Sequence, residues 1–177
     1  MTAIGGKVAI VKRPGELGVH SMDTFNMLVP DLRVAEDFYK SFGLDVREEG
    51  NSLGIYTFAS SQRWASIAEG QRKKLNFLSF GVFEEDFEPI KKRIEAQGVR
   101  LMDAPPGFDS NGVWFRDHND ILVEVKVAEK TSPNEKSAFD MISGPAGVAA
   151  APQRSKASKV RPTRLAHVLC FTVDVLR

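Results

Sequence analysis

The pattern of apolar and polar positions predicts a strand, a helix and three further strands in the first half of the chain. Bulky and β-branched residues over 24–29 are typical of a strand, which Pro30 ends. Asp31 can cap the following helix, because its carboxylate accepts from the free backbone N–H groups of the first turn. Gly43 ends that helix. Apolar residues at three- and four-residue spacing lie on one face of this helix: Leu32, Ala35, Phe38, Tyr39 and Phe42. Turn-forming residues separate the three short strands that follow, 44–47, 53–58 and 64–68.

The same order of elements recurs in the next fifty residues. Residues 75–83 predict a strand, and a helix with one apolar face opens at Glu85 and ends at Gly98. Three more strands complete the set: 99–102, 112–116 and 121–127. Two βαβββ units are therefore expected, recognised by element order and not by sequence identity between the halves. Neither unit can bury its helix and its sheet face alone, so we expect an α+β fold in which the pair curves into a half-open mixed β-barrel around a cleft.

The composition changes after the second unit. Residues 128–164 are rich in Pro, Gly and Ala, and their basic run from Arg154 to Arg164 contains no acid, which favours a solvated linker over a nucleic-acid arm. Residues 165–177 then predict a strand and the first residues of a helix. We expect a first module over 1–127, a linker over 128–164 and the first strand of a truncated second module over 165–177.

The net charge and the length of the apolar runs argue against some classes of partner. Lys and Arg total 24 against 23 acids, a net charge of +1, which argues against nucleic acid as the main partner. The apolar runs are too short to span a bilayer, and the first residues lack a secretion signal, so no membrane partner and a cytoplasmic location are expected. The single cysteine, Cys170, excludes an intramolecular disulfide, and its apolar neighbours predict a buried side chain.

Two segments of the chain share one motif. Thr24 to Leu32 aligns with His167 to Val175, and both end in an aspartate followed by an aliphatic residue that opens a helix. Together with Phe38-Tyr39, Phe42-Gly43-Leu44 and the late strand 116–125, this order resembles the vicinal oxygen chelate superfamily. That superfamily includes glyoxalase I, bleomycin-resistance proteins and type I extradiol ring-cleavage dioxygenases. The resemblance covers residues 20–127 and resumes at 165.

The resemblance implies metal-ligand positions on the first, fifth and eighth strands. Here they fall on Thr24, about Phe77 and Glu124, so only Glu124 remains as a degenerate ligand and the first module is expected to be metal-free. Extradiol chemistry needs two histidines and one carboxylate on Fe(II). His167 matches the first-ligand position of the second module, and the other two ligands would lie beyond Arg177. No catalytic residue is assigned.

The resemblance favours an extradiol dioxygenase of catechol-like aromatics, using O₂ and Fe(II), with Mn(II) as the alternative metal. The complete protein is expected to be a homo-oligomer, and the 177-residue chain is expected to be inactive because it lacks two ligands. Two alternatives stay open: a small-molecule-binding protein of the bleomycin-resistance type, and a glyoxalase-like isomerase. Thr24 and Phe77 weigh against the isomerase, since they remove its usual ligands.

Several residues also have structural interpretations. We expect Glu124 to be a cleft-facing or salt-bridged carboxylate rather than a ligand. Considered without the repeated motif, His167 could be an ordinary strand histidine. His118 lies in a charged turn, so we expect it at the solvated surface, and we expect a structural role for His20. The two tryptophans, Trp64 and Trp114, predict core or interface packing.

Overall fold

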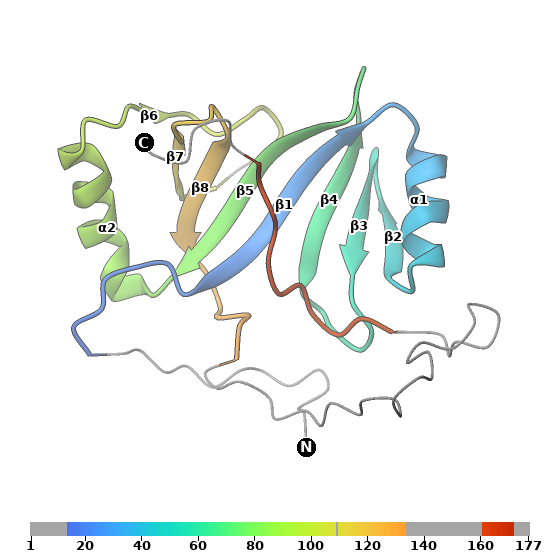
Figure 1. Cartoon of the computed structure of the whole chain (residues 1–177), viewed down its shortest axis with the longest axis horizontal. Helices are drawn as coiled ribbons and strands as arrows, with labels where there is room; N and C mark the ends of the chain where they lie inside the picture. The colour runs from blue at the N-terminus through green and yellow to red at the C-terminus, as the bar shows by residue number, and fades with distance from the viewer. Residues whose placement is uncertain (1–13, 109, 134–160, 172–177) are drawn as a thin grey trace, which may run out of the picture.

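A single mixed sheet with a helix at each end forms the body of the chain (Figure 1). The computed structural model describes residues 14–108, 110–133 and 161–171. The first unit comprises β1 (Ser21–Val29), α1 (Leu32–Ser41), β2 (Asp45–Glu49), β3 (Ser52–Tyr56) and β4 (Arg63–Glu69). The second comprises β5 (Lys74–Val82), α2 (Glu84–Ala96), β6 (Leu101–Met102), β7 (Val113–Arg116) and β8 (Leu122–Val127).

The eight strands lie in the order β2-β3-β4-β1-β5-β8-β7-β6. Within each unit the first strand pairs in parallel with the last, β1 with β4 and β5 with β8, while β1 and β5 pair antiparallel and join the two halves. The sheet is mixed and does not close into a barrel. This arrangement confirms the predicted α+β fold of paired βαβββ units.

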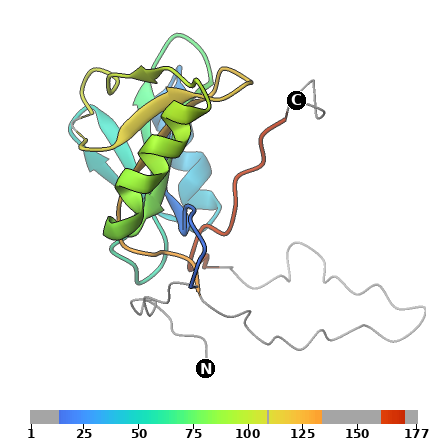
Figure 2. The ribbon, with the colours of Figure 1, turned by 90° about the vertical axis from the view of Figure 1, so that its left-hand side faces the viewer.

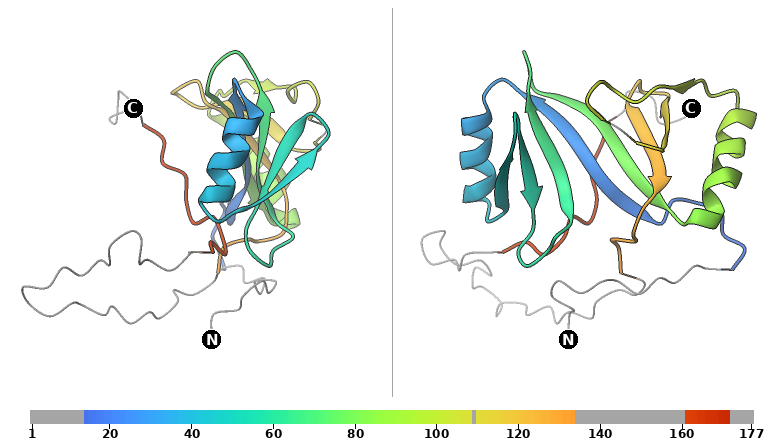
Figure 3. Two further views of the ribbon diagram at one scale, coloured as in Figure 1. Left: turned by 90° about the vertical axis from the view of Figure 1, so that its right-hand side faces the viewer. Right: turned by 180° about the vertical axis from the view of Figure 1, so that it is seen from behind.

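Each helix covers its own half of the sheet. Ala35 of α1 packs in a cluster of buried residues from β1, β3 and β4, and Ile90 of α2 packs with Val82 and the apolar residues of β8. Seen from behind, the helices lie at opposite ends of the sheet (Figure 3). Asp31 caps α1 as predicted, since its Oδ1 accepts from the backbone N–H groups of Arg33 and Val34 at 2.8 and 3.1 Å. None of the helices in the described residues is long and apolar enough to cross a membrane.

The first residues of the predicted linker lie against β1. Thr131 Oγ1 donates to the carbonyl of Met22 at 2.6 Å, and Ser132 Oγ donates to the carbonyl of His20 at 3.0 Å. Residues 128–132 therefore fasten the end of the second unit to the start of the first. Most of the predicted linker, residues 134–160, lies outside the described part of the chain.

The described C-terminal segment, 161–171, is fastened to the β3–β4 loop. The Phe58 N–H donates to the Pro162 carbonyl at 3.0 Å, and Thr57 Oγ1 donates to the Thr163 carbonyl at 2.9 Å. From there the segment runs beside the sheet without joining it (Figures 1 and 2). The expected second module itself stays a prediction.

Two expectations for this segment differ from the structure. Residues 165–171 pair with no described strand, although the sequence predicts a strand there, because a strand forms only where a neighbour satisfies its backbone groups. Cys170 is exposed and not buried, as are Leu169 and Phe171, because none of the apolar surface in the described part of the chain covers them. Residues 172–177 lie outside the described residues.

Candidate functional site

Four buried side chains share one register row across the centre of the sheet. Thr24 on β1 faces Ser79 on β5, Ser79 faces Glu124 on β8, and Glu124 faces Trp114 on β7. We call these four residues the polar row. Cross-strand partners point to the same face of a sheet. The neighbouring row contains Phe25 and Val123, which pack with the helix-side clusters. The polar row therefore occupies the face that the helices leave open, where the resemblance places the cleft.

Glu124 is buried, and its carboxylate is already engaged by the protein. Ser110 Oγ donates to Glu124 Oε1, and the same hydroxyl accepts from the Gly112 N–H at 2.9 Å. Lys126 Nζ lies 3.8 Å from Glu124 Oε2 and pairs with Asp23 at 2.8 Å. Of the two structural interpretations of Glu124, the Lys126 contact agrees with the salt-bridged carboxylate.

The rest of the row carries polar atoms without partners. The Thr24 and Ser79 hydroxyls and the Trp114 indole N–H have no hydrogen-bond partner in the described structure, and all three residues are buried. Phe77 fills the space beside them, and its ring meets the Trp114 ring edge-on at 4.9 Å. Two residues after Thr24 on β1, the buried Asn26 side chain donates to Ser66 Oγ at 2.7 Å. The interior of this face is thus built from hydroxyl, amide and aromatic groups.

These residues do not fit an Fe(II) centre. A non-haem Fe(II) site needs imidazole nitrogens beside its carboxylate, and here the corresponding positions present the Thr24 hydroxyl and the Phe77 ring. Among the described residues no three His, Cys, Asp or Glu side chains are grouped as metal ligands would be. The donor set is therefore wrong for iron in the first module.

The three histidines lie in three different surroundings. His20 is part-buried at the start of β1, where its Nε2 lies 3.1 Å from the Ala128 carbonyl. His118 is exposed in the β7–β8 turn, and its Nε2 lies 3.0 Å from Asn119 Nδ2. His167 is exposed in the C-terminal segment. The described polar partners of Glu124 are Ser110 and Lys126, so the structure does not bring a histidine to it.

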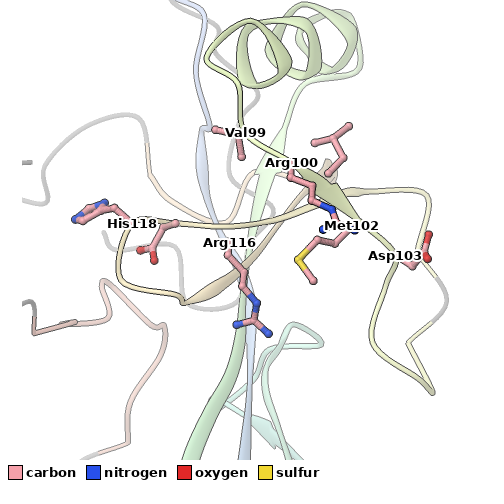
Figure 4. A pocket seen from close by; sticks show the side chains of 8 residues that line it. Val99, Arg100, Met102, Asp103, Arg116 and His118 are labelled. Carbon is pink, nitrogen blue, oxygen red and sulfur yellow. The ribbon is translucent and has the colours of Figure 1, made fainter.

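An open cavity of about 750 Å³ lies at the β6 edge of the sheet, lined by residues 99–103 and 116–118 (Figure 4). It contains none of the polar-row residues. The sequence did not predict this cavity, because the pairing of β6 with β7 is what brings Arg100 and Arg116 to the same wall.

The comparison of sequences identifies the family of the chain. Residues 21–125, from the start of β1 into β8, match the model of the Glyoxalase/Bleomycin resistance protein/Dioxygenase superfamily. The chain belongs to this superfamily. Its match thus spans both βαβββ units, in agreement with the resemblance seen in the motifs.

One curated relative within the superfamily is Metapyrocatechase 2 of Cupriavidus necator. It is 45% identical to this chain over 160 residues, an alignment that covers 90% of the chain and 49% of the relative. The chain thus spans about half the length of that enzyme.

Solved structures of the superfamily share the fold. BphC, a halotolerant catechol dioxygenase, matches with a TM-score of 0.55 and 16% identity, over 67% of this chain and 43% of its own. The 2,3-dioxygenase LapB from Pseudomonas sp. KL28 matches with a TM-score of 0.55 and 20% identity, over 68% and 44%. The Mn(II)-bound glyoxalase from Novosphingobium aromaticivorans matches with a TM-score of 0.54 and 16% identity, over 68% and 42%.

Proposed function

We propose that the complete protein is an extradiol ring-cleavage dioxygenase of catechol-like aromatics, and that this chain supplies its first module and the start of its metal-binding module. The observation that carries the proposal is the 45% identity to Metapyrocatechase 2 over 90% of the chain. Two of the structures that share its fold are a catechol dioxygenase and a 2,3-dioxygenase.

The chemistry of the first module supports a metal site elsewhere in the complete protein. Phe77 and the engaged carboxylate of Glu124 leave the first module without an Fe(II) donor set. His167 aligns with Thr24 at the start of the repeated motif, so we assign it the role of first metal ligand in the second module. Fe(II) held by two imidazoles and a carboxylate keeps one face open for a chelating catecholate and O₂. Mn(II) is the alternative metal.

The remaining expectations are part of the same proposal. The complete protein would act in the cytoplasm as a homo-oligomer, with a small aromatic substrate and O₂ as its partners. Light scattering of the purified protein measures the oligomeric state directly.

The first test is the activity of the protein that the complete reading frame encodes. We would sequence the coding DNA past Arg177 to its stop codon, express that protein and the 177-residue chain, and load both with Fe(II) without air. The longer protein should consume catechol and O₂ in equal amounts, whereas the 177-residue chain should consume neither. A longer protein that takes up iron and cleaves no catechol-like ring would contradict the assignment.

The second test isolates His167. His167→Ala in the longer protein should lower the bound iron at least tenfold and abolish O₂ uptake, because it removes one of three metal ligands. His118→Ala is the matched control, since His118 is also exposed and has no metal role in the proposal. Full iron content and activity in the His167→Ala protein would remove His167 from the metal site.

A further inference from the structure

The cavity beside β6 has two guanidinium groups on its wall. Leu101 faces Phe115 and Met102 faces Trp114 in the antiparallel β6–β7 pair. Arg100 directly precedes β6 and Arg116 ends β7, so continuing the register by one position sets Arg100 across from Arg116, and both residues line the cavity. Two like charges directly opposite each other on paired strands repel, so this arrangement lowers stability unless something negative lies between them.

Neither Asp103 nor Asp117, the two acids that line the cavity, forms an ion pair with Arg100 or Arg116 among the described residues. Asp117 Oδ1 accepts from the backbone N–H groups of Asn119 and Ile121, both at 2.9 Å, and so shapes the β7–β8 turn. The Asp103 side chain extends away from the two guanidinium groups (Figure 4). The acids that line the cavity are therefore occupied or turned outward.

The two arginine side chains differ in the contacts that they make with the rest of the protein. Arg116 contacts the exposed carboxylate of Asp120 at 3.4 Å and donates to the Asp120 carbonyl at 2.6 Å. Arg100 has neither a hydrogen bond nor an ion pair within the part of the chain that the structure describes. An exposed ion pair such as that of Arg116 contributes little, so both guanidinium groups remain able to bind an anion.

Apolar groups lie beside the charges. Met102 is 42% exposed, and its side chain lies between those of Arg100 and Arg116 in the view of Figure 4. Val99 and Leu101 also line the cavity. A ligand bound in this cavity would contact two guanidinium groups and an apolar wall at the same time.

We propose that this cavity binds a small organic carboxylate, with the carboxylate held by Arg100 and Arg116 and the hydrocarbon part against Met102. The planar guanidinium fork matches the two oxygens of a carboxylate, and a neighbouring apolar surface favours an aromatic or aliphatic acid over inorganic phosphate. This site is separate from the polar row and from His167, so it does not depend on the proposed reaction.

Calorimetric titration of the 177-residue chain and of the longer protein tests the site. Benzoate should bind at one saturable site in both proteins. Benzamide has the same shape without the charge and should bind at least tenfold more weakly, and inorganic phosphate should also bind more weakly than benzoate. Absence of saturable benzoate binding, or tighter binding of phosphate, would overturn the proposed ligand class.

Variants then locate the binding. Arg100→Ala should weaken benzoate binding at least tenfold, and Met102→Ala should weaken it to a smaller extent. Arg72→Ala is the matched control, because Arg72 is exposed in the β4–β5 loop, away from the cavity lining. Since Arg100 is exposed and faces the like charge of Arg116, its variant should unfold at the temperature of the parent chain or slightly above it. Equal weakening by Arg100→Ala and Arg72→Ala would indicate general charge attraction and contradict the site.

Discussion

Thr24 and Ser79 face each other across the antiparallel pair that joins the two units, and neither buried hydroxyl has a hydrogen-bond partner among the described residues. A buried hydroxyl without a partner costs free energy, because it gave up water on folding and gained nothing in return. At the first-strand position where the resemblance implies a metal ligand, this chain has Thr24, a small polar residue that faces another small polar residue, Ser79.

Replacing Thr24 by valine should therefore stabilise the chain. Thr24→Val keeps the shape and removes the unpartnered hydroxyl, so the free energy of unfolding should rise by about 1 kcal/mol. Thr57→Val is the matched control: the Thr57 hydroxyl is also buried, but it accepts from Trp64 and donates to the Thr163 carbonyl. That control should cost about 1–3 kcal/mol. Urea unfolding measures both, and a loss of stability in Thr24→Val would show that its hydroxyl has a partner.

Ser110 should matter for stability through Glu124. Ser110→Ala removes the hydroxyl that donates to the buried carboxylate, so it should lower the free energy of unfolding by about 1–3 kcal/mol. Ser41→Ala removes a hydroxyl at the exposed end of α1 and should change the stability by less than about 0.5 kcal/mol. Equal effects of the two variants in urea unfolding would argue that Glu124 does not need Ser110.

The cap of α1 gives a prediction about local structure. Asp31→Ala leaves the N–H groups of Arg33 and Val34 without their acceptor, and should cost about 0.5–2 kcal/mol. Asp37→Ala changes an exposed aspartate within the same helix and should have little effect, because alanine is the better helix former there. Thermal unfolding by circular dichroism compares the two, and an equal loss would mean that the cap contributes nothing.

His20 should make the stability depend on pH. Burial lowers the pKa of His20 below its ordinary value, against the opposing effect of the Ala128 carbonyl. The neutral ring suits its contacts, since Nε2–H can donate to Ala128 and Nδ1 can accept from Ser21. The unfolded chain therefore binds the proton more readily, so this contribution is present above about pH 6.5 and is lost as the pH falls through the folded pKa.

Unfolding measured between pH 8 and pH 5 tests this dependence. The parent chain should lose stability as the pH falls, and His20→Gln should lose less over the same range. His118→Gln should behave as the parent does, because His118 is an exposed turn residue. Identical pH profiles for the parent and His20→Gln would contradict a role for this histidine.

Some features of the fold follow from local sequence and were predictable. Asp31 caps its helix because the capping bonds join residues two and three positions apart. Trp64 and Trp114 are buried as predicted, because large aromatic side chains within apolar strands remove a large apolar area from water when they pack in the core. Cys170 was predicted wrongly, because burial depends on what covers a segment and not on the polarity of its neighbours in sequence.

The sequence by itself determined the order of the elements, the two repeated units and the replacement of histidine by Thr24 and Phe77, since periodicity and motif are local properties of the chain. Only the tertiary structure decided which residues share a row. The pairing of Thr24 with Ser79 and of Ser79 with Glu124 depends on strand register, and a shift of one strand by one residue would turn its side chains to the other face.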